Sequence, residues 1–191
     1  MKSGFVTDLC SETREKELVD AFLSTRSETA FGAAASMLFS RLVRYFSVRG
    51  LDKETAEELA QDVLMIIYRK SEALRNKESF YGWLYKIARN QHLQHVRRQK
   101  HDVQIVELDC LPHPASQPNS GSIPEETEFC HWISPLEAEE KQIMILRYME
   151  ELSYQEIATA LSLPMGTVKW KLFDAKSKLT AILGQSQGRT A

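Results

Sequence analysis

The chain has 191 residues, of which 43% are hydrophobic and 26% are charged, with a formal net charge of −2. This length and composition support one or two modest hydrophobic cores. No apolar run approaches the roughly 20 residues that a membrane-spanning helix needs, and the N-terminus lacks the apolar core of a signal peptide. Three widely spaced cysteines argue against a disulfide framework, so we expect a cytoplasmic protein.

The small net charge hides three regions of different sign. Residues 26–101 carry 14 Lys or Arg against 8 Asp or Glu. Residues 102–140 carry nine acids and no Lys or Arg, and residues 141–191 carry seven bases against four acids. Two basic regions that flank an acidic one favour a polyanionic partner.

Apolar side chains recur at helical spacing through residues 15–47, and Gly50 suits a C-terminal stop. Asp52 is expected to cap the next helix. The inward stripe of that helix is predicted to be Ala56, Leu59, Ala60, Val63, Leu64, Ile67 and Tyr68. Its outward face carries Glu57, Glu58, Gln61, Asp62 and Met65. The pattern leaves open whether this face is solvated surface or a docking surface for a protein.

A further helix is predicted over residues 80–99, which combine aromatic and basic side chains. Interleaved rings and cations suit single-stranded nucleic acid, because bases stack on the rings while the cations follow the backbone. The alternative is that Trp83 and Tyr85 are core residues beneath a basic helix. His92 and His95 lie three residues apart with no third metal ligand nearby, and we expect them to be surface histidines.

Segment 109–126 holds four of the six prolines and is predicted to be an extended linker. The residues in and near it that could bind zinc are Cys110, His113, Cys130 and His131, whose spacing matches no common zinc site. We therefore expect no metal and no cofactor. The chain also lacks a phosphate-binding glycine loop or a nucleophile–base pair, so no enzyme activity is expected.

Residues 152–179 are predicted to form two short helices joined by a tight turn. Ser153 and Glu156 match a capping box, and Tyr154, Ile157, Ala158 and Leu161 fall on one face. Ser162, Leu163 and Pro164 end the first helix. The second helix has a buried stripe of Val168, Leu172, Ala175 and Leu179 and an outer side with Thr167, Lys169, Trp170, Lys171 and Asp174. This arrangement favours a DNA-reading helix-turn-helix over a plain helical hairpin.

Three segments in order carry a resemblance to a known family: TAEELAQDVLMIIYRK, FYGWLYKIARNQHLQHVRR and LRYMEELSYQEIATALSLPMGTVKWKL. Together they resemble a bacterial sigma factor of the extracytoplasmic-function (ECF) group, in the sigma-70 family. The resemblance implies an all-α fold with two small helical domains, region 2 and region 4, joined by a flexible acidic linker. The expected parts are an N-terminal tail (1–14), region 2 (15–101), the linker (102–131), region 4 (132–184) and a C-terminal tail (185–191).

The resemblance also implies partners and sites. Core RNA polymerase would be bound through a coiled coil of its largest subunit, promoter DNA would be melted and read, and an anti-sigma factor would regulate the chain. The implied docking residues are Glu58, Gln61, Asp62 and Met65. The implied minus-ten residues are Trp83, Tyr85, Lys86, Arg89, Asn90, Arg97 and Arg98. The implied minus-35 residues are Thr167, Lys169, Trp170, Lys171, Phe173 and Asp174.

The chain departs from the family pattern at three positions. Gln94 replaces a usual acid, Trp170 replaces a small polar residue, and Asp174 stands where a base is usual. Two other functions therefore stay open: a sigma-like decoy that sequesters an anti-sigma factor, and a helix-turn-helix regulator that works without polymerase. The decoy leaves the basic aromatic helix without a role. The regulator leaves both the ELAQDV face (residues 58–63) and residues 80–100 unexplained.

Overall fold

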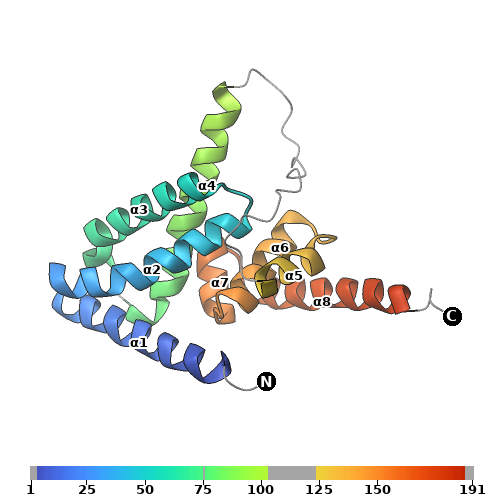
Figure 1. The fold of residues 1–191 in the computed structure, drawn as a ribbon, viewed down its shortest axis with the longest axis horizontal. Helices are drawn as coiled ribbons and strands as arrows, with labels where there is room; N and C mark the ends of the chain where they lie inside the picture. The colour runs from blue at the N-terminus through green and yellow to red at the C-terminus, as the bar shows by residue number, and fades with distance from the viewer. Residues whose placement is uncertain (1–3, 75, 103–123, 188–191) are drawn as a thin grey trace. The chain divides into compact units, whose positions relative to one another are not determined.

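A computed structural model describes residues 4–74, 76–102 and 124–187, and within these ranges every regular element is a helix (Figure 1). The all-α prediction is therefore confirmed. The chain divides into two compact units, Met1–Phe80 and Tyr81–Ala191, and each is described by itself. No helix in the described ranges is both long and apolar enough to cross a membrane.

The first unit is a layer of three helices: α1 (Gly4–Thr25), α2 (Glu28–Val48) and α3 (Lys53–Lys70). Two 3₁₀ turns follow, η1 (Ser71–Ala73) and η2 (Lys77–Ser79). Helix α2 lies between α1 and α3 and packs against both (Figure 1). Its fully buried side chains Leu38, Leu42 and Phe46 form the centre of the core.

The helical pattern of residues 15–47 is interrupted between α1 and α2. Arg26 adopts a left-handed backbone conformation with φ of 54°, and Ser27 accepts a hydrogen bond from the N–H of Ala30 as the N-cap of α2. An ion pair ties the two helices together, with Arg41 Nη1 2.6 Å from Glu15 Oε1 and both side chains largely buried. Helix α1 starts at Gly4 and so extends through most of the predicted tail.

Helix α3 begins as predicted. Asp52 Oδ1 accepts from the N–H of Thr55 at 3.0 Å, and this bond and the Thr55 hydroxyl lower the pKa of Asp52. Gly50 follows the end of α2 with φ of 87°, which a side chain would strain. Six of the seven stripe residues are buried. Tyr68 is the exception: it lies at the end of the stripe and is 39% exposed, with its ring against Phe31.

The second unit contains α4 (Phe80–Asp102), apart from its first residue, and α5 (Pro124–Ile133). It continues with α6 (Ala138–Met144), the π-helical turn η3 (Ile145–Met149), α7 (Tyr154–Leu161) and α8 (Met165–Gln187). Helices α6, α7 and α8 surround a core that includes Ile143, Leu146, Ile157 and Val168. Most of the predicted linker lies outside the described residues, and the part from Pro124 onward is helical.

Candidate nucleic-acid and polymerase interfaces

The turn between α7 and α8 has the geometry that the sequence predicts. Ser153 and Glu156 form a reciprocal capping box at the start of α7. Ser162 ends the helix in a left-handed conformation with φ of 56°, and its N–H bonds back to the carbonyl of Thr159. Pro164 directly precedes α8, and its carbonyl accepts from the N–H of Val168. This short connection fixes the start of α8 against the end of α7.

Helix α8 has three distinct sides. Val168, Leu172 and Ala175 are buried, as predicted, and Leu179 is half-buried. The opposite side is open to solvent and presents Lys169, Trp170 and Phe173; the two rings are 62% and 71% exposed. Two exposed rings on one side of a helix form an apolar surface that a binding partner can cover. We name Lys169, Trp170 and Phe173 the reading face.

The remaining predicted minus-35 residues lie beside the core stripe rather than on the reading face. Thr167, Lys171 and Asp174 are half-buried. Lys171 Nζ lies 2.7 Å from Glu139 Oε2 of α6, and Asp174 Oδ2 lies 3.0 Å from Lys178 Nζ. The prediction of a single outer side was therefore wrong. Helical spacing did not separate an outward side chain from one that contacts a neighbouring helix.

A cation–aromatic cluster next to the reading face escaped the sequence analysis. Tyr154 is 39% exposed rather than part of the buried face of α7. Its ring centroid lies 5.1 Å from the guanidinium carbon of Arg147 and 5.9 Å from Lys169 Nζ. Arg147 also donates to the carbonyl of Leu152 at 2.8 Å, which anchors the cluster to the loop before α7. The signal for this site is spatial, because Arg147, Tyr154 and Lys169 come from three elements.

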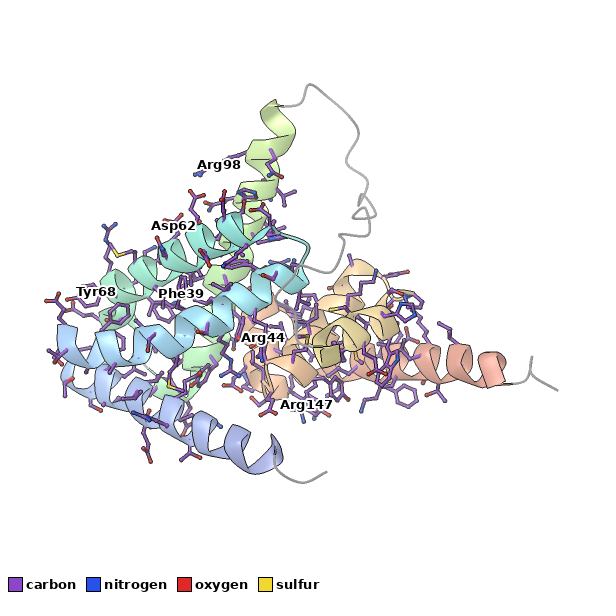
Figure 2. All side chains as sticks on the ribbon, viewed as in Figure 1. Phe39, Arg44, Asp62, Tyr68, Arg98 and Arg147 are labelled. Carbon is purple, nitrogen blue, oxygen red and sulfur yellow. The ribbon has the colours of Figure 1, made fainter. Side chains whose placement is uncertain are left out.

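Helix α4 carries cations along its exposed surface; it begins at Phe80 as predicted and ends at Asp102, beyond the predicted end at Gln99. The exposed members of the predicted minus-ten set are Lys86, Asn90, Arg97 and Arg98, while Trp83 and Arg89 are half-buried. Figure 2 shows Arg98 near the C-terminal end of the helix. His92 is buried at 5% exposure, so the prediction of a surface histidine was wrong at that position.

Tyr85 differs from the rest of the minus-ten set because its ring is fully buried. Its hydroxyl donates to a carboxylate oxygen of Glu150, which is 2% exposed. In the same turn of α4, a Cβ added at Gly82 would lie 2.8 Å from the backbone oxygen of Glu156. The ring of Tyr85 therefore has the surroundings of a core residue in this structure, and Trp83 is the more accessible of the two aromatic side chains.

The outward face of α3 is open to solvent as expected. Glu58, Gln61 and Asp62 are exposed, and Met65 is 49% exposed. Spacings of three, four and seven residues place these four on one side of the helix. Figure 2 shows Asp62 on the side of α3 that points away from α2. An exposed methionine among carboxylates and an amide gives a polar surface with one adaptable apolar contact.

Of the four residues that could bind zinc, Cys110 and His113 lie outside the described residues. Cys130 and His131 belong to α5. Within the described residues, no group of three or more His, Cys, Asp or Glu side chains is placed to hold a metal ion.

Comparison with known proteins identifies the family. The model of Sigma-70 region 2 matches residues 34–101, and the model of Sigma-70 region 4 matches residues 133–179. The two matches occur in this order and together cover more than half of the chain. The protein belongs to the sigma-70 family, in its ECF group. The matched ranges fall inside the predicted region 2 and region 4 domains, whose limits remain predictions.

Several curated relatives are sigma factors. RNA polymerase sigma-H factor of Pseudomonas aeruginosa is 29% identical over 144 residues, which cover 69% of this chain and 75% of the relative. ECF RNA polymerase sigma factor RpoE of Cereibacter sphaeroides is 25% identical over 179 residues, which cover 91% of this chain and 97% of the relative.

Two solved structures share the fold. RpoE of Bartonella quintana, crystallised with the anti-sigma factor NepR, matches with a TM-score of 0.60 and 24% identity, covering 81% of this chain and 96% of that one. CnrH in complex with the cytosolic domain of CnrY matches with a TM-score of 0.62 and 17% identity, and the match covers 90% of this chain and 98% of CnrH.

Proposed function

We propose that this ECF sigma factor binds core RNA polymerase and directs it to promoters that it melts at the minus-ten element and reads at the minus-35 element. The observation that carries this proposal is the ordered match of region 2 and region 4 to helices whose outward faces remain open. The protein acts in transcription initiation, in the cytoplasm, and carries out no chemistry of its own.

Polymerase docking is assigned to the outward face of α3. Glu58, Gln61, Asp62 and Met65 are exposed, adjacent and free of any role in the core. A partner helix lying along this face would meet carboxylates that complement basic side chains, with Met65 as the apolar contact. This face is the counterpart of the family segment that binds the coiled coil of the largest polymerase subunit.

Minus-ten melting is assigned to α4. Lys86, Arg97 and Arg98 supply exposed positive charge for the phosphates, and Asn90 supplies an exposed amide for a base edge. Extruding a base from the duplex costs a few kcal/mol, and contacts in a pocket and stacking on a ring must offset this cost. Trp83 is the side chain proposed to stack, because Tyr85 is buried against Glu150.

Minus-35 reading is assigned to the reading face of α8 and to the cation–aromatic cluster beside it. Trp170 and Phe173 offer apolar contact to a thymine methyl group or a sugar. Arg147 and Lys169 gather two positive charges around Tyr154 at the edge of that face. These two cations are suited to phosphate contacts, which position the protein without specifying sequence.

Regulation by an anti-sigma factor is part of the proposal. RpoE of Bartonella quintana forms a complex with the anti-sigma factor NepR, and CnrH forms one with the cytosolic domain of CnrY. A comparable partner for this chain would compete with polymerase or DNA for the surfaces described above.

A gel shift with and without core polymerase separates the proposal from its two alternatives. The probe is a pool of double-stranded DNA randomised over the upstream promoter element. A sigma factor is expected to shift specific members of the pool only when core is present. Core-independent specific binding would favour the regulator, and no specific binding under either condition would favour the decoy.

A further inference from the structure

Three charged residues of α8 lie together on the side of the helix that adjoins α6. Lys171, Asp174 and Lys178 are spaced three and seven residues apart, so they share one side. Lys169 and Phe173 lie on the opposite side, and Trp170, four residues before Asp174, lies between the two. Glu139 and Glu140 face them from the first turn of α6. We name Glu139, Glu140, Lys171, Asp174 and Lys178 the α6–α8 clasp.

Glu140 is the centre of the clasp. Its side chain is 5% exposed, and one carboxylate oxygen accepts from the backbone N–H of Glu137 at 3.0 Å in a capping box. The other oxygen bonds Lys178. A buried carboxylate is costly unless its oxygens are satisfied. The position of Lys178, and with it the position of α8, is therefore tied to the start of α6.

Asp174 completes this arrangement one turn earlier in α8. Its carboxylate holds Lys178 Nζ at 3.0 Å, so the ammonium bridges a carboxylate of its own helix and one of α6. Hydrogen bonds to Glu140 and Asp174 raise the pKa of Lys178 above its ordinary value. Lys171 adds a second, parallel bridge to Glu139 at 2.7 Å.

We propose that Asp174 and Lys171 are positioning residues, which set the placement of the reading face through Lys178, Glu140 and Glu139, and that neither reads DNA. This inference rests on the proposed minus-35 role of α8. It also accounts for an acid where the family usually carries a base: Asp174 is paired with Lys178 within the domain, which offsets part of its charge although Lys178 is shared with Glu140. The repulsion between Asp174 and phosphate is reduced correspondingly.

The test measures the affinity of reconstituted holoenzyme, made with full-length chain, for the promoter that wild type selects from a library randomised over the upstream element. Asp174→Asn and Glu139→Lys are the informative variants because the two accounts predict opposite signs. A positioning role predicts weaker binding for both, by roughly two- to fivefold, the range for a partly exposed ion pair. An Asp174 that only faces phosphate predicts tighter binding for both, since each change makes the surface more positive. An Asp174 that accepts from a cytosine amino group instead predicts that Asp174→Asn changes the selected sequence, which a positioning role leaves unchanged.

A charge exchange supplies the matched control. Glu139→Lys combined with Lys171→Glu is expected to return affinity to within about twofold of wild type, with the selected sequence and the salt slope unchanged. Lys171→Glu alone is measured beside the exchange. Tighter binding of Asp174→Asn or of Glu139→Lys would overturn the positioning role. So would an exchange variant that binds no better than Lys171→Glu alone. A thermal melt of each variant shows whether it is folded. If a single variant is unfolded, the deciding result is whether the exchange variant returns promoter affinity to the wild-type level.

The outcome for the reading face is separate. Lys169→Gln and Trp170→Ser lie outside the clasp and test the proposed function itself. If these two changes leave affinity, salt slope and sequence preference untouched, α8 does not read DNA and the proposed minus-35 role fails. If they act as expected while Asp174→Asn tightens binding, only the positioning inference fails.

Discussion

Ser153 and Glu156 cap each other across the first turn of α7. The N–H of Ser153 donates to Glu156 Oε2 at 2.8 Å, and the N–H of Glu156 donates to Ser153 Oγ at 3.3 Å. Two N–H groups that the helix itself leaves without a partner are thereby satisfied. The capping box sets where α7 begins, directly after the loop that Arg147 anchors.

Replacing Ser153 with alanine should lower the free energy of unfolding by about 1 kcal/mol, because alanine cannot accept from the N–H of Glu156. Ser153→Thr is the matched control, since its hydroxyl can accept from the N–H of Glu156 and donate to the Glu156 carboxylate at the same position. Urea denaturation of the full chain measures both changes. Equal midpoints for wild type and Ser153→Ala would show that the capping box adds no stability.

Features set by local chemistry were predictable from the sequence. The caps at Asp52 and Ser153, the stop at Gly50 and the buried stripes of α3 and α8 depend on residues a few positions apart. The break at Arg26 was missed because apolar spacing continues across it, and only the backbone shows the left-handed residue.

Contacts between distant residues were not predictable. The ion pairs of Lys171 and Lys178 join positions more than 30 residues apart, and periodicity carries no information about such a partner. Tyr68 and Tyr154 lie at the ends of their helices, where a stripe leaves the core, and both rings are half-open to solvent. His92 was predicted to lie on the surface because it is polar, but other parts of the structure cover it and it is buried.

The double variant Gln61→Ala and Asp62→Lys should weaken the binding of core polymerase without changing helicity. Both side chains are exposed on α3, so the fold loses no buried contact, while the docking face loses an amide and reverses a charge. Fluorescence titration of labelled chain with core measures the affinity. Glu72→Lys, an exposed charge reversal on η1, is the control and should bind normally. If the double variant bound core polymerase with wild-type affinity, the outward face of α3 would not be part of the interface.

Asn90→Ala should leave core binding intact and reduce open-complex formation. Asn90 is exposed, so its truncation creates no cavity, but the amide available to an extruded base is lost. Permanganate reactivity of minus-ten thymines reports the open complex. Gln99→Ala is the control, since Gln99 is exposed on the other side of α4. If both variants melted DNA as wild type does, Asn90 would have no part in minus-ten recognition.

Lys169 and Trp170 should respond differently to substitution although they are neighbours. Lys169→Gln should weaken binding similarly across sequences and lower the salt slope by roughly one, as expected for one lost phosphate contact. Trp170→Ser should change which upstream sequence is preferred, because its ring is 62% exposed on the reading face. Holoenzyme binding to the randomised library, repeated at several salt concentrations, distinguishes the two effects.

In vitro transcription tests the central claim most directly. Purified chain is added to core RNA polymerase on templates taken from the library-selected promoters and on matched templates with a scrambled minus-ten element. We predict a discrete transcript that requires the chain, core and the intact element together, and that Asn90→Ala reduces. Tight binding to core without any chain-dependent transcript from selected templates would contradict the account and leave sequestration of an anti-sigma factor as the function.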